Sequence, residues 1–154
     1  MGDRGNIVVL NKKYGTDEYE GVWLYSHWGG HRLEGTARKA VANCGRVGDP
    51  SYLARIIFCN MIADGFRDLD TGLMGRELIE REMAKGDVSE MALFLGQMVD
   101  EFLSETGYGI SLEGAGDQEY PTVCVDADTG KIWTDPNLPT RTSQITFPAP
   151  IGVV

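Results

Sequence analysis

Strand-like apolar runs near both ends of this chain enclose a middle part whose apolar residues recur at helical spacing. Near the N-terminus, "GNIVVLN" (residues 5–11) and "VWLYSH" (residues 22–27) are strand-length runs on either side of a polar turn. "YGISL" and the hairpin-like "TVCVDADTGKIW", with its turn at Gly130, supply three more strands. Strands segregated from helices predict an α+β fold. We expect an N-terminal β-hairpin, a helical middle and C-terminal strands that form a mainly antiparallel sheet, with helices packed on one face.

The helical middle shows clear start signals. Asp49 and Pro50 are typical of the N-cap and the first residue of a helix, here one that continues past residue 60. We expect a shorter and more polar helix over residues 71–85. Asp87 and Glu90 then form a capping box at the start of another helix over 87–103. That helix carries a stripe at helical spacing, and we expect the stripe to face the core: Met91, Phe94, Leu95, Met98 and Phe102.

The chain has the size of one domain, and no linker or internal repeat interrupts it. Its 154 residues suffice for a single core. Four of the six prolines fall at the C-terminal end. We therefore expect one α+β domain over residues 1–135 and an extended, proline-rich tail over residues 136–154.

The charge is distributed unevenly. Residues 1–60 hold 8 Lys/Arg and 6 Asp/Glu (+2), and residues 61–154 hold 6 and 17 (−11), which together give the net charge of −9. This balance argues against general nucleic-acid binding. A solvated acidic surface explains the C-terminal part, and an acidic face for a basic partner is the alternative.

The cysteines and the N-terminal sequence indicate the cellular compartment in which we expect the protein. Three cysteines without a CxxC pair argue against a disulfide framework, so we expect Cys44, Cys59 and Cys124 to be buried, reduced thiols. We find no signal-peptide pattern and no membrane-spanning run. We expect a cytoplasmic protein, in the host cytoplasm if the protein is viral, with no membrane partner; the oligomeric state is not indicated.

The octapeptide "YSHWGGHR" (residues 25–32) is the candidate site. It leaves a strand, passes through two glycines and enters a helix, so main-chain N–H groups are free at the helix start, where the dipole favours an anion. Two basic residues in a first helical turn are unfavourable, which predicts a compensating negative group: a carboxylate of this protein or a ligand phosphate. We expect the ligand-binding residues to be Tyr25, His27, Trp28, Gly29, Gly30, His31 and Arg32, with Arg4 as a further cation. The alternative is a purely structural turn.

The first 45 residues resemble a family of small proteins of bacteriophages and some prokaryotes. The resemblance rests on "MGDRGNIVV", which fits M-G-x-R-x-x-I-V-V, followed by "YSHWGG", which fits Y-x-H-W-x-G. The segment "DPSYLARIIF" (residues 49–58) is similar to a related group. Many members have Asp where this chain has Gly29. The family has no assigned activity, so the resemblance implies a fold and a viral or mobile-element setting.

No catalytic constellation is convincing. His27 and His31 are four residues apart, but Trp28 and the two glycines between them are unfavourable in a helix, so we expect no metal site and no other cofactor. Ser26 and His27 point to opposite faces of a strand, which argues against a nucleophile–base pair. The carboxylates of "ADGFRDLD" (residues 63–70) are more typical of solvated or capping groups than of a nuclease site.

These observations favour a non-catalytic binding protein of viral or mobile-element type. It would engage a host protein or sequester an anionic small ligand. One alternative is an enzyme that acts on a nucleotide or phosphate ester at residues 25–32. Another is an acidic mimic of nucleic acid that blocks a host defence protein.

Overall fold

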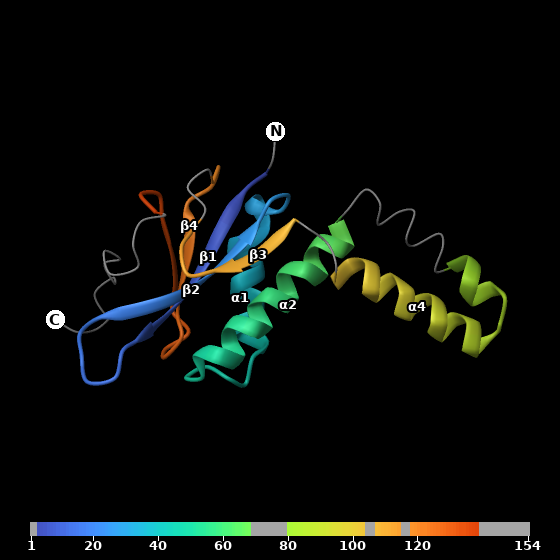
Figure 1. Ribbon diagram of the computed structural model, residues 1–154, viewed down its shortest axis with the longest axis horizontal. Coiled ribbons are helices and arrows are strands. Elements are labelled where there is room, and N and C mark those ends of the chain that lie inside the picture. The colour runs from blue at the N-terminus through green and yellow to red at the C-terminus, as the bar shows by residue number, and fades with distance from the viewer. Residues whose placement is uncertain (1–2, 69–79, 104–106, 115–117, 139–154) are drawn as a thin grey trace.

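Five strands form one mixed sheet in the order β3-β2-β1-β4-β5 (Figure 1). The computed structural model describes residues 3–68, 80–103, 107–114 and 118–138. All neighbouring strands pair antiparallel except β1 and β4, which are parallel. The mainly antiparallel α+β fold expected from the sequence is confirmed. The strand bounds are β1 Gly5–Lys12, β2 Tyr19–Ser26, β3 Tyr108–Ser111, β4 Thr122–Asp126 and β5 Ile132–Asp135.

Helices occupy the middle of the chain, as expected. A 3-10 turn (Gly30–Arg32) leads directly into α1 (Leu33–Asn43), and α2 (Pro50–Asp68) follows. Residues 80–84 are helical, and α4 (Val88–Leu103) precedes β3. Both α1 and α2 pack against the sheet and against each other. Among the described helices, none has the length and apolar content to cross a membrane.

The two faces of the sheet carry separate apolar clusters, because successive strand residues point to opposite faces. We call the face covered by α1 and α2 the front face and the other one the back face. Ile7, Val9 and Leu24 belong to the front cluster, together with buried residues of both helices. The back cluster consists of Val8, Leu10, Trp23, Cys124 and Leu138, with Trp133 packed against it.

Local signals in the sequence are realised in the backbone. The N–H of Tyr52 donates to Asp49 Oδ1 (3.4 Å), so Asp49 caps α2. Asp87 Oδ1 likewise accepts from two N–H groups in the first turn of α4, at 3.0 and 3.1 Å. Gly130 takes a φ of +75° in the β4–β5 turn. The caps formed by Asp49 and Asp87 and the turn at Gly130 are thus confirmed, whereas the contribution of the Glu90 side chain to the capping box stays a prediction.

Two burial predictions are wrong in the described part of the chain. Cys59 is exposed, because it lies on the opposite side of α2 from the buried Ile57 and Met61; Cys44 is half-buried, and only Cys124 is buried. In α4, Met91 and Phe94 are only half-buried, and α4 has at most marginal contact with the sheet, α1 or α2. The other three residues of the expected stripe, most of the tail and part of the predicted helix over 71–85 lie outside the described residues or have undescribed side chains.

A charged side chain joins the two helices of the front face. Asp64 of α2 accepts a hydrogen bond from the Thr36 hydroxyl (2.6 Å) and forms an ion pair with Lys39, both on α1. The Asp64 side chain is only 15% exposed. It therefore links the two helices from a half-buried position and is not the solvated carboxylate that its sequence neighbourhood indicates.

Candidate functional site

Main-chain hydrogen bonds fix the octapeptide to two distant parts of the chain. The N–H of Asp3 donates to the carbonyl of His27 (3.0 Å), and the N–H of Gly30 donates to the carbonyl of Asp3 (2.7 Å). On the other side, the N–H of His27 donates to the carbonyl of Gly107, just before β3 (2.8 Å). Residues 25–32 are thus anchored on both sides, which makes them a rigid platform.

Glycine is required at position 30 by close packing. A Cβ built there would lie 2.7 Å from Cδ2 of Tyr120 and 2.8 Å from the carbonyl carbon and oxygen of Arg4. The turn therefore packs directly on the segment that leads into β1. At Gly29 the nearest atoms to a Cβ are side-chain ends, the Arg32 guanidinium at 2.6 Å and the Ser26 hydroxyl at 3.1 Å. A side chain is consequently tolerated better at position 29 than at position 30.

The aromatic residues of the octapeptide form a cluster that we call the aromatic corner: Tyr25, His27 and Trp28. Tyr25 and His27 are two residues apart and so share the back face, where the Tyr25 hydroxyl and His27 Nδ1 are hydrogen-bonded at 3.0 Å. The His27 and Trp28 rings meet edge to face with centroids 4.3 Å apart. Trp28 is 55% exposed. The corner thus presents a large aromatic surface whose neighbours hold it in place.

An open hollow lies beside this corner. It has a volume of about 530 Å³ and runs along β3 and the residues after it, with Tyr25 on one side. Gly109, which pairs with Tyr25 across the two strands, has no side chain to cover the tyrosine ring. A partner that contacts Trp28 has room to extend along the edge of the sheet.

A carboxylate of the chain itself occupies the start of the helical segment. Asp3 Oδ1 accepts a hydrogen bond from the main-chain N–H of His31 (3.1 Å), and Asp3 Oδ2 is bonded to His31 Nδ1. Loss of hydration, and then the charge and hydrogen bond of Asp3, raise the pKa of the Tyr120 hydroxyl above its usual value. The compensating negative group expected from the sequence is therefore Asp3. In the sequence this group is one acidic residue at position 3, and nothing in the sequence alone connected that residue to residue 31.

The basic groups of the candidate site turn to different partners. Arg4 forms an ion pair with Glu119 (3.4 Å), and His31 is paired with Asp3. His27 is hydrogen-bonded to Tyr25. The Arg32 guanidinium lies against Gly29 and points toward α2. The structure brings all eight predicted residues into one region, but their cations do not converge on one point.

Comparisons with known proteins add no relative. No protein-family model, no curated protein and no solved structure matches this chain. Among the described residues, no group of three His, Cys, Asp or Glu side chains is placed to hold a metal ion. The class that the fold and the site define is an α+β protein with a rigid aromatic corner.

Proposed function

We propose that this protein is a non-catalytic binding protein that engages another protein through the aromatic corner. Exposed tryptophan and tyrosine side chains are enriched among the residues that dominate binding energy at protein interfaces. Here the His27 ring supports Trp28, and Tyr25 holds His27. Such a surface loses little side-chain entropy when a partner binds, because its rotamers are already restricted.

The position of Asp3 is the observation that carries this proposal. An anionic ligand would be expected at the free N–H groups of the helix start, and Asp3 already accepts the N–H of His31 there. A phosphate would have to displace this carboxylate and separate it from His31. A protein contact at Trp28 requires neither change, so it is favoured over a sequestered anion and over an enzyme that acts on a phosphate ester.

The resemblance in the first 45 residues suggests that the partner is a host protein of a virus or mobile element. The acidic C-terminal part supports a second hypothesis, in which the chain imitates nucleic acid and blocks a basic host protein. The two hypotheses differ in salt dependence. A complex through the aromatic corner depends mainly on apolar burial, whereas an acidic mimic loses affinity steeply as salt is added.

The test compares the full chain with Trp28→Ala and with Tyr14→Ala as a matched control. Tyr14 is fully exposed in the β1–β2 turn, away from the corner. Each protein captures partners from a host lysate, and the affinity of a captured partner is then measured. We expect Trp28→Ala to weaken binding about 30-fold or more, as removal of a central interface aromatic does, and Tyr14→Ala to leave it unchanged.

Two results would contradict the proposal. One is that the wild-type chain captures no protein more strongly than Trp28→Ala does. The other is that a nucleotide or phosphate ester raises the melting temperature, or is turned over, and that His27→Ala or His31→Ala abolishes the effect. The second result would establish the ligand or enzyme alternative.

A further inference from the structure

Strand β3 forms one edge of the sheet. The order β3-β2-β1-β4-β5 gives β3 a neighbour on one side, and among the described residues no strand pairs with its other side. The two helices cover little of β3, because α1 packs on β1, β4 and β5 and α2 packs on β1 and β2. Ile110 is accordingly 59% exposed, and Leu112, which follows the strand, is 81% exposed. An edge of this kind can pair with a further strand.

The hydrogen bonds between β2 and β3 show which main-chain groups point outward. The N–H of His27 donates to the carbonyl of Gly107, and the register continues from this pair to Tyr25 and Gly109. In an antiparallel ladder, hydrogen-bonded and non-hydrogen-bonded pairs alternate. Gly107 and Gly109 therefore bond toward β2, whereas the N–H and carbonyl groups of Ile110 point to the outer edge. There they can form two hydrogen bonds to the main chain of an added strand.

The two edge strands of the sheet differ in their protection against pairing. Edge strands of soluble proteins commonly carry charged residues or proline, which discourage pairing with another chain. At the opposite edge, β5 includes Asp135 and follows Lys131. In contrast, β3 has the sequence YGIS without charge or proline, and Glu113 lies two residues beyond its end. The composition of β3 thus favours pairing with another segment more than that of β5 does.

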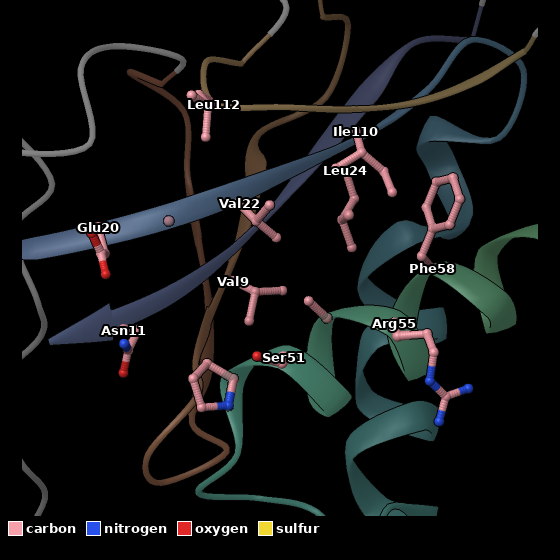
Figure 2. A pocket seen from close by; sticks show the side chains of 13 residues that line it. Val9, Asn11, Glu20, Val22, Leu24, Ser51, Arg55, Phe58, Ile110 and Leu112 are labelled. Carbon is pink, nitrogen blue, oxygen red and sulfur yellow. The ribbon is translucent and has the colours of Figure 1, made fainter.

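Hollows flank the β3 edge on both faces of the sheet. On the front face, an apolar groove of about 540 Å³ lies between the sheet and α2, and Ile110 and Leu112 line it beside β3 (Figure 2). The hollow next to the aromatic corner is lined by the same two residues and by Tyr25 of the back face. Successive side chains of a strand point to opposite faces. A strand added to β3 would therefore direct its side chains alternately toward the groove and toward the hollow.

The β3 edge continues into the aromatic corner. His27 pairs with Gly107, one residue before β3, and its ring meets that of Trp28. Because the corner lies at the beginning of β3, one extended segment of a partner can pair with the strand and also reach Trp28. The net charge of −9 disfavours the alternative that β3 pairs with β3 of a second copy, because two such chains repel each other.

We propose that the partner is bound through an extended segment that adds a further strand to the sheet beside β3. This inference rests on the proposed function and names the form of the segment that the partner contributes. In this mode of binding, main-chain hydrogen bonds supply affinity and side chains at alternate positions supply specificity. The side chains that meet Ile110 and Leu112 should be apolar. The segment as a whole should be neutral or basic, since the chain is acidic.

The test uses a displayed library of short random peptides as the probe, selected on the full wild-type chain. The affinities of selected peptides are then measured for Ile110→Pro, with Thr134→Pro as the matched control. Proline is tolerated where the N–H of an edge strand faces outward, so Ile110→Pro removes that N–H and keeps the bonds to β2. The exposed Thr134 has the equivalent position on β5, because the bonded pair Asp126–Lys131 sets the alternation there.

We expect Ile110→Pro to weaken peptide binding about tenfold or more and Thr134→Pro to leave it unchanged. Circular dichroism checks that both variants are folded. Methylation of the peptide's own main chain gives a second measurement that needs no variant of the protein. N-methyl groups at successive peptide residues should weaken binding at every second residue, because only alternate N–H groups face β3.

Several results would overturn the added strand. These are a library without a binder, full affinity for Ile110→Pro, and N-methyl effects that do not alternate along the peptide. A wild-type dimer that Ile110→Pro dissociates would show instead that β3 pairs with a second copy. Peptides that lose affinity for Trp28→Ala but not for Ile110→Pro would support the proposed function and contradict the added strand. The opposite response would support the added strand and contradict binding through the aromatic corner.

Discussion

Replacement of Gly30 by alanine tests whether the octapeptide is packed as closely as the structure indicates. The new Cβ would lie 2.7 Å from Tyr120 Cδ2 and 2.8 Å from two main-chain atoms of Arg4. Those main-chain atoms cannot yield easily, because the N–H of Gly30 is bonded to the carbonyl of the preceding Asp3. Overpacking of this kind costs about 1–3 kcal/mol, and the reduced entropy of the unfolded chain offsets about 0.4–1 kcal/mol of it. We expect a net loss of about 1–2 kcal/mol.

The measurement is urea unfolding followed by circular dichroism, with Gly35→Ala as the matched control. Gly35 lies in α1 with no atom within 4 Å of a built Cβ, so alanine there should stabilise the protein by up to about 1 kcal/mol. The two variants carry the same chemical change and should shift the unfolding midpoint in opposite directions. If Gly30→Ala proves as stable as Gly35→Ala, the close approach of the turn to residues 3 and 4 is refuted, and with it the rigid platform beneath Trp28.

Three further predictions concern single side chains. Gly29→Asp should change stability by less than about 0.5 kcal/mol in the same urea assay, because the new side chain meets the movable guanidinium of Arg32, with which it can pair. Asp64→Asn should cost about 1–3 kcal/mol, since its partners on α1 lose a charged acceptor in a half-buried place, again measured by urea unfolding. Burial raises the pKa of the Cys124 thiol from 9.0 to about 12, so at pH 8 a thiol reagent should modify the exposed Cys59 long before Cys124. Because the unfolded thiol ionises first, stability should also fall as the pH rises from about 9 toward 12, and equal reactivity of the two thiols would contradict this account.

Much of the local structure could be predicted from sequence periodicity and cap residues. The two strands of the first hairpin, the start of α2 at Pro50, the capping of α4 by Asp87 and the turn at Gly130 all follow from short-range chemistry. These signals work because they depend on residues only a few positions apart. Burial within a helix was less predictable, as Cys59 shows: a broad apolar stripe does not reveal which side faces the sheet.

The candidate site depends both on local sequence signals and on contacts between segments far apart in the chain. The octapeptide stood out in the sequence because two histidines, a tryptophan and two glycines fall within eight residues. That Tyr25 and His27 share a face follows from strand alternation alone. The role of Asp3 did not, since its contact with His31 joins residues 28 positions apart. It forms only because β1 pairs with β2 and brings the N-terminus beside the helix start.

By itself, the sequence determined the class of the fold, the order of its elements and most of their boundaries, because these depend on local periodicity and on turn and cap residues. Only the tertiary structure decided that β4 pairs parallel to β1, that Asp3 occupies the place expected for an anion, and that two helices leave part of the sheet open. These features arise from contacts between segments far apart in the chain. Each depends on how the available widths, charges and apolar surfaces fit together, and no short stretch of sequence carries that information.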